Sequence, residues 1–159
     1  KNHNLSHCGS HAMDTMRMES GFLHWGHDIS PEENQYEAGL NFAISYKKET
    51  NFIGKESLLK IKNKAQNRRF IMLSLTDNTP GAPLLLHEEP IYLKEKIIGR
   101  TTSGNYSFNY KKNLSFGYVK SEHTNEELTK MDLYIEVAKK KYPVIVELTS
   151  LKDKQAKFL

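Results

Sequence analysis

The sequence has very little cysteine and no long apolar run. Cys8 is the only cysteine among 159 residues, which excludes an internal disulfide framework and a four-cysteine zinc site and fits a reducing compartment. The longest apolar runs, such as residues 84–86, span only three or four residues, whereas a membrane-spanning helix needs about 20. We therefore expect neither a fold stabilised by disulfide bonds nor a membrane-spanning segment.

The sequence also lacks the motifs of several common enzyme classes. It contains no Gly-x-Gly-x-x-Gly dinucleotide fingerprint, no phosphate-binding loop and no Gly-x-Ser-x-Gly nucleophile elbow. No residue pair indicates a catalytic nucleophile with its base, so we name no catalytic residue. Any flavin or nicotinamide chemistry is expected to take place elsewhere.

An initiator methionine and a recognisable signal peptide are absent as well. The chain opens with Lys1, Asn2 and His3, with no charged stretch running into an apolar segment. We expect a processed chain or a fragment whose start falls inside a domain. The expected compartment is the cytoplasm, or the mitochondrial matrix in a eukaryote.

The charge balance is basic, but it does not indicate a nucleic-acid surface. The net charge is +4, and 19 of the 23 basic residues are lysines. They occur singly or in short clusters such as residues 139–141, without the interleaved aromatic side chains of a base-stacking platform. A solvated surface explains them better, and we expect no nucleic-acid partner.

The first part of the chain reads as helix, strand and helix. Apolar residues recur at helical spacing over residues 10–20, and Gly21 ends the pattern. Residues 40–45 alternate between apolar and polar side chains, which predicts a strand. Residues 56–64 carry apolar side chains on one side and lysines on the other, which predicts a second amphipathic helix.

From Arg68 onward the apolar residues recur with period two instead. We expect strands at residues 70–75, 91–93, 97–101, 114–119, 133–137 and 142–146. So many short strands favour a small antiparallel barrel or sandwich. The predicted fold class is α+β and mostly β, a helix-strand-helix segment over residues 1–66 followed by an antiparallel β-barrel of about six strands over residues 67–159.

Histidines near the start raise the question of a metal site. His3, His7 and His11 recur every four residues and would share one face of a helix, as zinc ligands often do. Gly9 interrupts that helix, however, and no glutamate stands beside the first histidine. We therefore predict no metal ligands.

Arg17 lies on an otherwise apolar helix and is followed by a turn that contains Trp25. An arginine in such a place can clamp a planar or carboxylated ligand through paired N–H donors. It can equally form a buried ion pair with Glu19 or Asp28, because a semi-buried arginine needs an acidic partner in either role. The residue pattern leaves both interpretations open.

Several consecutive motifs resemble the glycine cleavage T-protein (aminomethyltransferase) family, and more closely the C-terminal part of sarcosine and dimethylglycine dehydrogenases. The matching residues are Ala12, Arg17, Glu19, Gly21, Trp25, Gly26, Asp28, Pro31, residues 36–40 (Tyr-Glu-Ala-Gly-Leu), residues 51–58 (Asn-Phe-Ile-Gly-Lys-Glu-Ser-Leu), residues 68–69, 89–92 and 99–104, and residues 142–143. The motifs occur in the family's order along nearly the whole chain.

The resemblance implies the end of a folate-binding domain over residues 1–66 and the family's C-terminal barrel over residues 67–159. It implies that Arg17 holds tetrahydrofolate, that Trp25 lines the same cavity and that Glu19 orients Arg17. FAD would bind only an N-terminal portion that is absent here, and no motif matches the family's catalytic aspartate. The implied partner is the remainder of the same enzyme, with its flavin domain and the first half of its folate domain.

These expectations describe part of an N-methyl amino acid dehydrogenase or of a related aminomethyltransferase in one-carbon and glycine metabolism. Such a portion is expected to be inactive alone and to bind tetrahydrofolate weakly or not at all. The alternative is a non-catalytic binding or docking module with a T-protein-like barrel.

Overall fold

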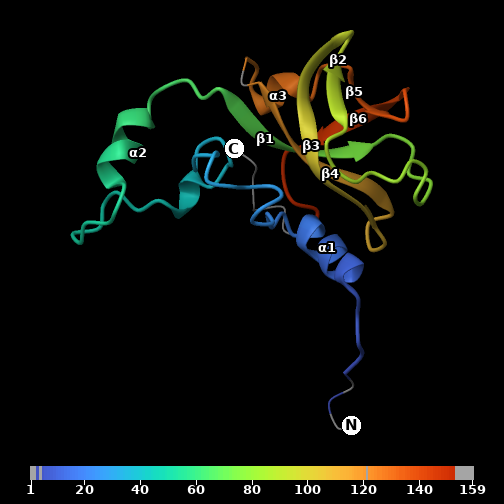
Figure 1. Cartoon of the computed structure of the whole chain (residues 1–159), viewed down its shortest axis with the longest axis horizontal. Coiled ribbons are helices and arrows are strands. Elements are labelled where there is room, and N and C mark those ends of the chain that lie inside the picture. Colours follow the sequence, from blue (N-terminus) through green and yellow to red (C-terminus); the bar gives the residue numbers. More distant parts are fainter. Residues whose placement is uncertain (1–2, 4, 121, 153–159) are drawn as a thin grey trace.

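Six strands form a closed antiparallel barrel in the computed structural model, which describes residues 3, 5–120 and 122–152 (Figure 1). The strands are β1 (Arg68–Leu75), β2 (Pro90–Leu93), β3 (Lys96–Ser107), β4 (Lys112–Lys120), β5 (Leu133–Val137) and β6 (Lys140–Glu147). Their order around the barrel is β1-β4-β3-β2-β5-β6, and β6 pairs with β1 to close it. The predicted fold class and strand number are confirmed.

Two clusters of buried side chains pack on the two faces of the barrel wall. On β1, Ile71 and Leu73 belong to the larger cluster, together with residues of all five other strands. Phe70 and Met72 alternate with them and join a second cluster that includes Met18 of the first helix. Because successive strand residues point to opposite faces, the larger cluster fills the barrel and the second lies between the wall and that helix.

The first helix, α1 (Ser10–Glu19), lies beside the barrel in Figure 1. It ends as the sequence predicted, because Gly21 adopts a positive φ of 76°, which a residue without a Cβ reaches at little cost. The Phe22 N–H then donates to the Arg17 carbonyl at 2.8 Å. The chain turns after the helix, and Asp28 then contacts Thr102 and Ser103 of β3.

A short helix that the sequence did not indicate lies between β4 and β5. This helix, α3 (Asn125–Leu128), begins with a capping box in which the Glu127 N–H donates to the Thr124 hydroxyl and the Thr124 N–H donates to the Glu127 carboxylate. Leu128 is buried in the larger core cluster. Four residues are too few to show helical periodicity.

Residues 40–61, which we call the arm, extend away from the barrel in Figure 1. They contain the 3₁₀ helix η1 (Asn41–Ala43) and the helix α2 (Lys55–Ile61). The predicted helix over residues 56–64 is confirmed with different ends, but the strand predicted over residues 40–45 is wrong. No described strand pairs with these residues, and an isolated strand leaves its backbone N–H and C=O groups without partners.

No helix in the described ranges has the length and apolar character needed to span a bilayer.

Candidate functional site

The carboxylate of Asp28 is the centre of the most developed polar cluster in the structure. Its Oδ2 accepts hydrogen bonds from Arg17 Nη1 at 2.7 Å and from the His24 backbone N–H at 2.8 Å. Its Oδ1 accepts from the hydroxyls of Thr102 and Ser103 at 2.6 and 2.7 Å. The Asp28 side chain has no exposed surface, so four donors replace the water that a buried carboxylate loses.

Arg17 uses most of its guanidinium donors within this cluster. Nε donates to Asp14 at 2.8 Å, Nη1 donates to Asp28 and to the Phe22 carbonyl, and Nη2 donates to the Ser103 hydroxyl at 2.9 Å. A guanidinium has five N–H donors, so one N–H of Nη2 is left for another acceptor. The ion pair with Asp28 that the sequence left open is present, and the alternative pair with Glu19 is not.

A bulge in β3 brings the two hydroxyls to Asp28. Adjacent residues of a regular strand point to opposite faces, yet Thr102 and Ser103 both reach the same carboxylate oxygen. The pairing of β3 with β4 shifts register between Thr101 and Ser103, and such bulges re-aim side chains. The sequence analysis missed both hydroxyls, because a bulge leaves little trace in the hydrophobic pattern.

Glu19 lies on the same helix as Arg17 but has different partners. It is 3% exposed, and its carboxylate accepts from the Ser107 hydroxyl at 2.6 Å and from the Asn109 side-chain amide at 2.8 Å. Both of its oxygens therefore anchor the end of α1 to the turn between β3 and β4. The predicted orientation of Arg17 by Glu19 is corrected: Asp14 and Asp28 orient it instead.

Trp25 lies in the turn between α1 and the barrel, three residues before Asp28. Its side chain is 65% exposed, while its backbone forms a parallel bridge with Ile29. The indole is not part of either core cluster. It presents an accessible aromatic face close in sequence to the Asp28 cluster.

The buried side chain of Tyr118 lies near several charged groups, among them Asp28. Tyr118 is 7% exposed, and burial raises the pKa of its hydroxyl, with the carboxylates of Glu33 and Asp28 adding to the rise. Among the described residues its hydroxyl has no hydrogen-bond partner. The sequence analysis did not single out Tyr118, whose position in a strand is typical of a core aromatic.

The described residues contain no group of three His, Cys, Asp or Glu side chains that could hold a metal ion. His24 and His27 stack on each other, with ring centroids 4.6 Å apart. Cys8 is exposed. The hydrogen bonds around Asp28 hold the Arg17 guanidinium in a fixed orientation. The cluster is therefore suited to orienting a bound group.

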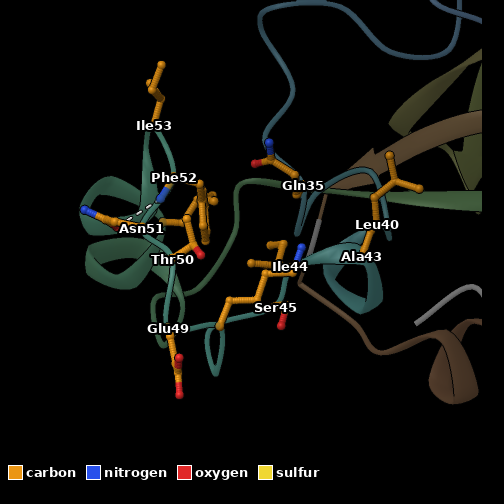
Figure 2. A pocket seen from close by; sticks show the side chains of 12 residues that line it. Gln35, Leu40, Ala43, Ile44, Ser45, Glu49, Thr50, Asn51, Phe52 and Ile53 are labelled. Carbon is orange, nitrogen blue, oxygen red and sulfur yellow. Dashed lines mark hydrogen bonds between the residues drawn. The ribbon is translucent and has the colours of Figure 1, made fainter.

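A pocket lies away from this cluster, in the arm and beside Gln35 (Figure 2). It has a volume of about 880 Å³ and is lined by residues 35, 40, 43–45, 48–53 and 58. Figure 2 shows Gln35 and Ile44 on one side, Asn51 and Phe52 on the other, and Ile53 pointing outward. None of Arg17, Glu19 and Trp25 lines it, so the residues implied by the family resemblance do not converge on this pocket.

Comparison with known proteins identifies the class to which this barrel and its docked helix belong. Residues 68–153 match the model of the glycine cleavage T-protein C-terminal barrel domain, and residues 1–48 match that of the GCVT N-terminal domain. The chain belongs to the glycine cleavage T-protein family. The matches leave residues 49–67 between them, and the division at residues 66 and 67 stays a prediction.

Similar proteins include a dehydrogenase, an oxidase and aminomethyltransferases. The chain is 34% identical over 143 residues to the mitochondrial dimethylglycine dehydrogenase of Rattus norvegicus, covering 89% of this chain and 16% of that protein. It is 42% identical over 102 residues to 4-methylaminobutanoate oxidase (formaldehyde-forming) of Paenarthrobacter nicotinovorans, covering 64% and 12%. It is 37% identical over 116 residues to an aminomethyltransferase of Listeria monocytogenes, covering 73% and 31%.

A solved structure shares the fold. Aminomethyltransferase T of the glycine cleavage system from Bartonella henselae superposes with a TM-score of 0.73 and 22% sequence identity, over 93% of this chain and 40% of that one. The chain therefore spans less than half the length of each of these proteins. The region described here corresponds to part of a larger enzyme in every one of them.

Proposed function

We propose that this chain is the tetrahydrofolate-facing portion of an N-methyl amino acid dehydrogenase of the sarcosine and dimethylglycine type, or of a related aminomethyltransferase, in one-carbon and glycine metabolism. The observation that carries the proposal is the Asp28 cluster, which fixes Arg17 on α1 within the part of the chain that such enzymes share. Residues 1–66 would be the end of the folate domain and residues 67–159 its barrel domain.

The residues at the cluster fit one wall of a folate site. Arg17 retains one N–H donor, and Trp25 presents an exposed aromatic face on which a planar ring can stack. Glu19 has both oxygens bonded within the protein, so its proposed role is to hold the end of α1 that bears Arg17. The opposite wall would come from the remainder of the enzyme, which also carries the site for FAD.

Tetrahydrofolate, when bound, supplies the amine that accepts a one-carbon unit and forms 5,10-methylenetetrahydrofolate. The contribution of this chain is to bind and orient. Asp28 holds the guanidinium at a fixed angle, and the barrel supports Asp28 through Thr102 and Ser103. Such preorganisation lowers the ordering cost of binding. The compartment would be the cytoplasm, or the mitochondrial matrix in a eukaryote.

The proposal is tested in a chimera in which this chain replaces the matched region of rat dimethylglycine dehydrogenase. Dye-linked oxidation of dimethylglycine is measured without folate, and 5,10-methylenetetrahydrofolate is measured with it. Trp25→Ala should lower the folate-linked product about tenfold and leave oxidation unchanged, because loss of one stacking contact is worth roughly 1–1.5 kcal/mol. Trp25→Phe should restore most of the product.

Phe108→Ala is the matched control, because Phe108 is 74% exposed but lies in the turn between β3 and β4. It should change neither reaction. Unchanged folate-linked product in Trp25→Ala would refute the proposed role of Trp25, and unchanged product in Arg17→Lys as well would refute the folate-facing function. Arg17→Lys keeps the charge but loses the planar fork.

A second candidate is a non-catalytic docking module with the same barrel. It is favoured by the commitment of four Arg17 contacts to protein acceptors, which is the arrangement of a structural clamp. For such a module, every variant named above would leave folate-linked product unchanged while Arg17 variants lower the melting temperature.

A further inference from the structure

Three of the five methionines of this chain lie on α1, and two of them are open to solvent. Met13 is 54% exposed and Met16 is 52% exposed, whereas Met18 is fully buried. Neither exposed side chain belongs to a core cluster of the described residues. A small reagent in water can therefore reach Met13 and Met16, but it cannot reach Met18.

Met13 lies on the same face of α1 as Arg17. Residues four apart in a helix are neighbours, with Cβ atoms about 5–6 Å apart, and a long side chain points toward the N-terminal end of its helix. The Arg17 guanidinium does point that way, because its Nε donates to Asp14 at 2.8 Å. Met16 directly precedes Arg17, and adjacent helix residues do not face each other. The two methionines thus match in exposure but differ in their position relative to Arg17.

Arg17 has one N–H donor without an acceptor among the described residues. Its Nη2 donates to the Ser103 hydroxyl at 2.9 Å, and Nη2 carries a second hydrogen. The thioether of Met13 is only a weak acceptor. Oxidation converts a thioether into a polar sulfoxide, whose oxygen is a stronger acceptor. A sulfoxide at Met13 would therefore place an acceptor for this N–H one helical turn away.

We propose that Met13 is a site of reversible oxidation by hydrogen peroxide, and that its sulfoxide occupies the remaining donor of Arg17. The sulfur lone pair attacks one peroxide oxygen, and the S–O bond forms as the O–O bond breaks. The proton on the transferred oxygen passes to the departing hydroxide, which leaves as water. Sulfur loses two electrons and the peroxide gains them. Methionine sulfoxide reductases reverse the change, so oxidation closes the Asp28 cluster to a ligand and reduction reopens it.

This inference rests on the proposed function for the source of the peroxide and for the ligand that is excluded. A flavin enzyme that passes two electrons to dioxygen releases hydrogen peroxide, so the remainder of the enzyme would supply the oxidant. Loss of the Arg17 donor would then lower the folate-linked product whenever dioxygen takes the electrons. The oxidation and its effect on Arg17 are measured with added hydrogen peroxide and without folate.

The test begins with the whole chain, which is treated with hydrogen peroxide and followed by peptide mass spectrometry. Met13 and Met16 should be oxidised at least about tenfold faster than Met18 and Met72, since oxidation follows exposure and the latter two are fully buried. NMR should then show that the Nη hydrogens of Arg17 exchange with water about tenfold more slowly, because a hydrogen bond to the sulfoxide protects them. Methionine sulfoxide reductases should restore the original exchange rate.

Met13→Leu and Met16→Leu are the matched variants, because leucine nearly keeps the volume of methionine and has no sulfur to oxidise. Peroxide should slow the Arg17 exchange in Met16→Leu as in the original sequence, and leave it unchanged in Met13→Leu. Equal slowing in both variants, no slowing in either, or oxidation of Met18 as fast as that of Met13 would overturn the proposal. Slowing that the reductases do not reverse would overturn its reversibility.

The two proposals can fail separately. In the chimera with rat dimethylglycine dehydrogenase, peroxide treatment followed by removal of the peroxide should lower the folate-linked product about fivefold, the effect of losing one ordinary hydrogen bond. Met13→Leu should prevent that loss. If the chimera makes no folate-linked product while Arg17 exchange in the chain still slows on oxidation, the proposed function is refuted and the Met13 site is retained. If the chimera makes the product and Arg17 exchange does not depend on Met13, the reverse holds.

Discussion

Arg17 and Asp28 form an ion pair whose burial costs free energy of desolvation. Removing one of the two charges also costs free energy. The Arg17 side chain is 14% exposed and that of Asp28 is fully buried, so both groups have lost most of their water. Their mutual attraction and the hydroxyls of Thr102 and Ser103 offset that loss. Removing one partner would leave the other charged and buried without compensation.

Arg17→Met is accordingly expected to lower the free energy of unfolding by about 3–5 kcal/mol, as measured by urea denaturation. Arg100→Met is the control, because Arg100 pairs with Glu88 at 2.8 Å while both side chains are more than half exposed. That exposed pair is worth about 0–1 kcal/mol. Equal effects of the two substitutions would show that Arg17 is not a structural clamp.

At the residue scale, the sequence indicated that Arg17 needs an acidic partner, but it did not indicate which acid that partner is. Arg17 was identified from its place on an apolar helix, and Asp28 was one of two acids considered for it. The choice between Glu19 and Asp28 depends on the turn at Gly21, which brings residue 28 back to the helix. The hydroxyls of β3 depend on a bulge, and periodicity does not predict a bulge of one residue.

At the scale of elements, β3 and β4 approach each other closely at Gly99. A Cβ placed there would lie 2.0 Å from the backbone carbonyl oxygen of Tyr118, and backbone atoms cannot move aside as a flexible side chain can. Gly99→Ala is therefore expected to lower the free energy of unfolding by about 3 kcal/mol or more.

Gly9→Ala is the control for that substitution, because a Cβ at residue 9 meets nothing within 4 Å and the backbone φ is −85°. It should change stability by less than about 1 kcal/mol. Thermal and urea unfolding of both variants provide the comparison. A Gly99→Ala protein as stable as Gly9→Ala would contradict the pairing of β3 with β4 described here.

The capping box of α3 predicts a pH dependence. Hydrogen bonds from the backbone and the hydroxyl of Thr124 hold the pKa of Glu127 below its ordinary value of 4.5. A carboxyl with a lower pKa in the folded state stabilises the fold above its unfolded pKa, and this contribution is lost as the pH falls through the folded pKa.

NMR titration should therefore give Glu127 a pKa below 4.5, and Thr124→Ala should move it back toward that value. The same substitution should destabilise the protein by about 1 kcal/mol near pH 7. A pKa for Glu127 that is unaffected by Thr124→Ala would exclude the Thr124 hydroxyl as a cause of the lowered pKa, because alanine keeps the backbone N–H.

Helices and strands were predictable from the sequence where their apolar faces pack against other elements of this chain. The barrel strands and α1 carry the periodicity of a face buried within this chain, so pattern and structure agree. Residues 40–45 carry the same kind of pattern but have no neighbouring strand, and the prediction failed there. A periodic pattern indicates that a face is covered, but it does not indicate whether the covering element belongs to the same part of the chain.

At the scale of the whole molecule, the barrel with α1 is a packed unit and the arm is not. Family membership and the shared fold match this chain to less than half the length of its relatives. Under the proposed function, the Asp28 cluster would supply one wall of a folate site. Half a site gives little affinity, because a single arginine contact contributes about 1.5–3 kcal/mol, most of which association entropy offsets.

Calorimetric titration with tetrahydrofolate tests this account most directly. It is run in parallel on this chain and on a chimera of Listeria monocytogenes aminomethyltransferase in which this chain replaces the matched region. We expect dissociation constants in the micromolar range for the chimera and millimolar or weaker for the chain by itself, a difference of about a thousandfold or 4 kcal/mol. Micromolar binding by the chain alone would contradict the one-wall account, and no binding by a folded chimera would contradict the folate-facing function.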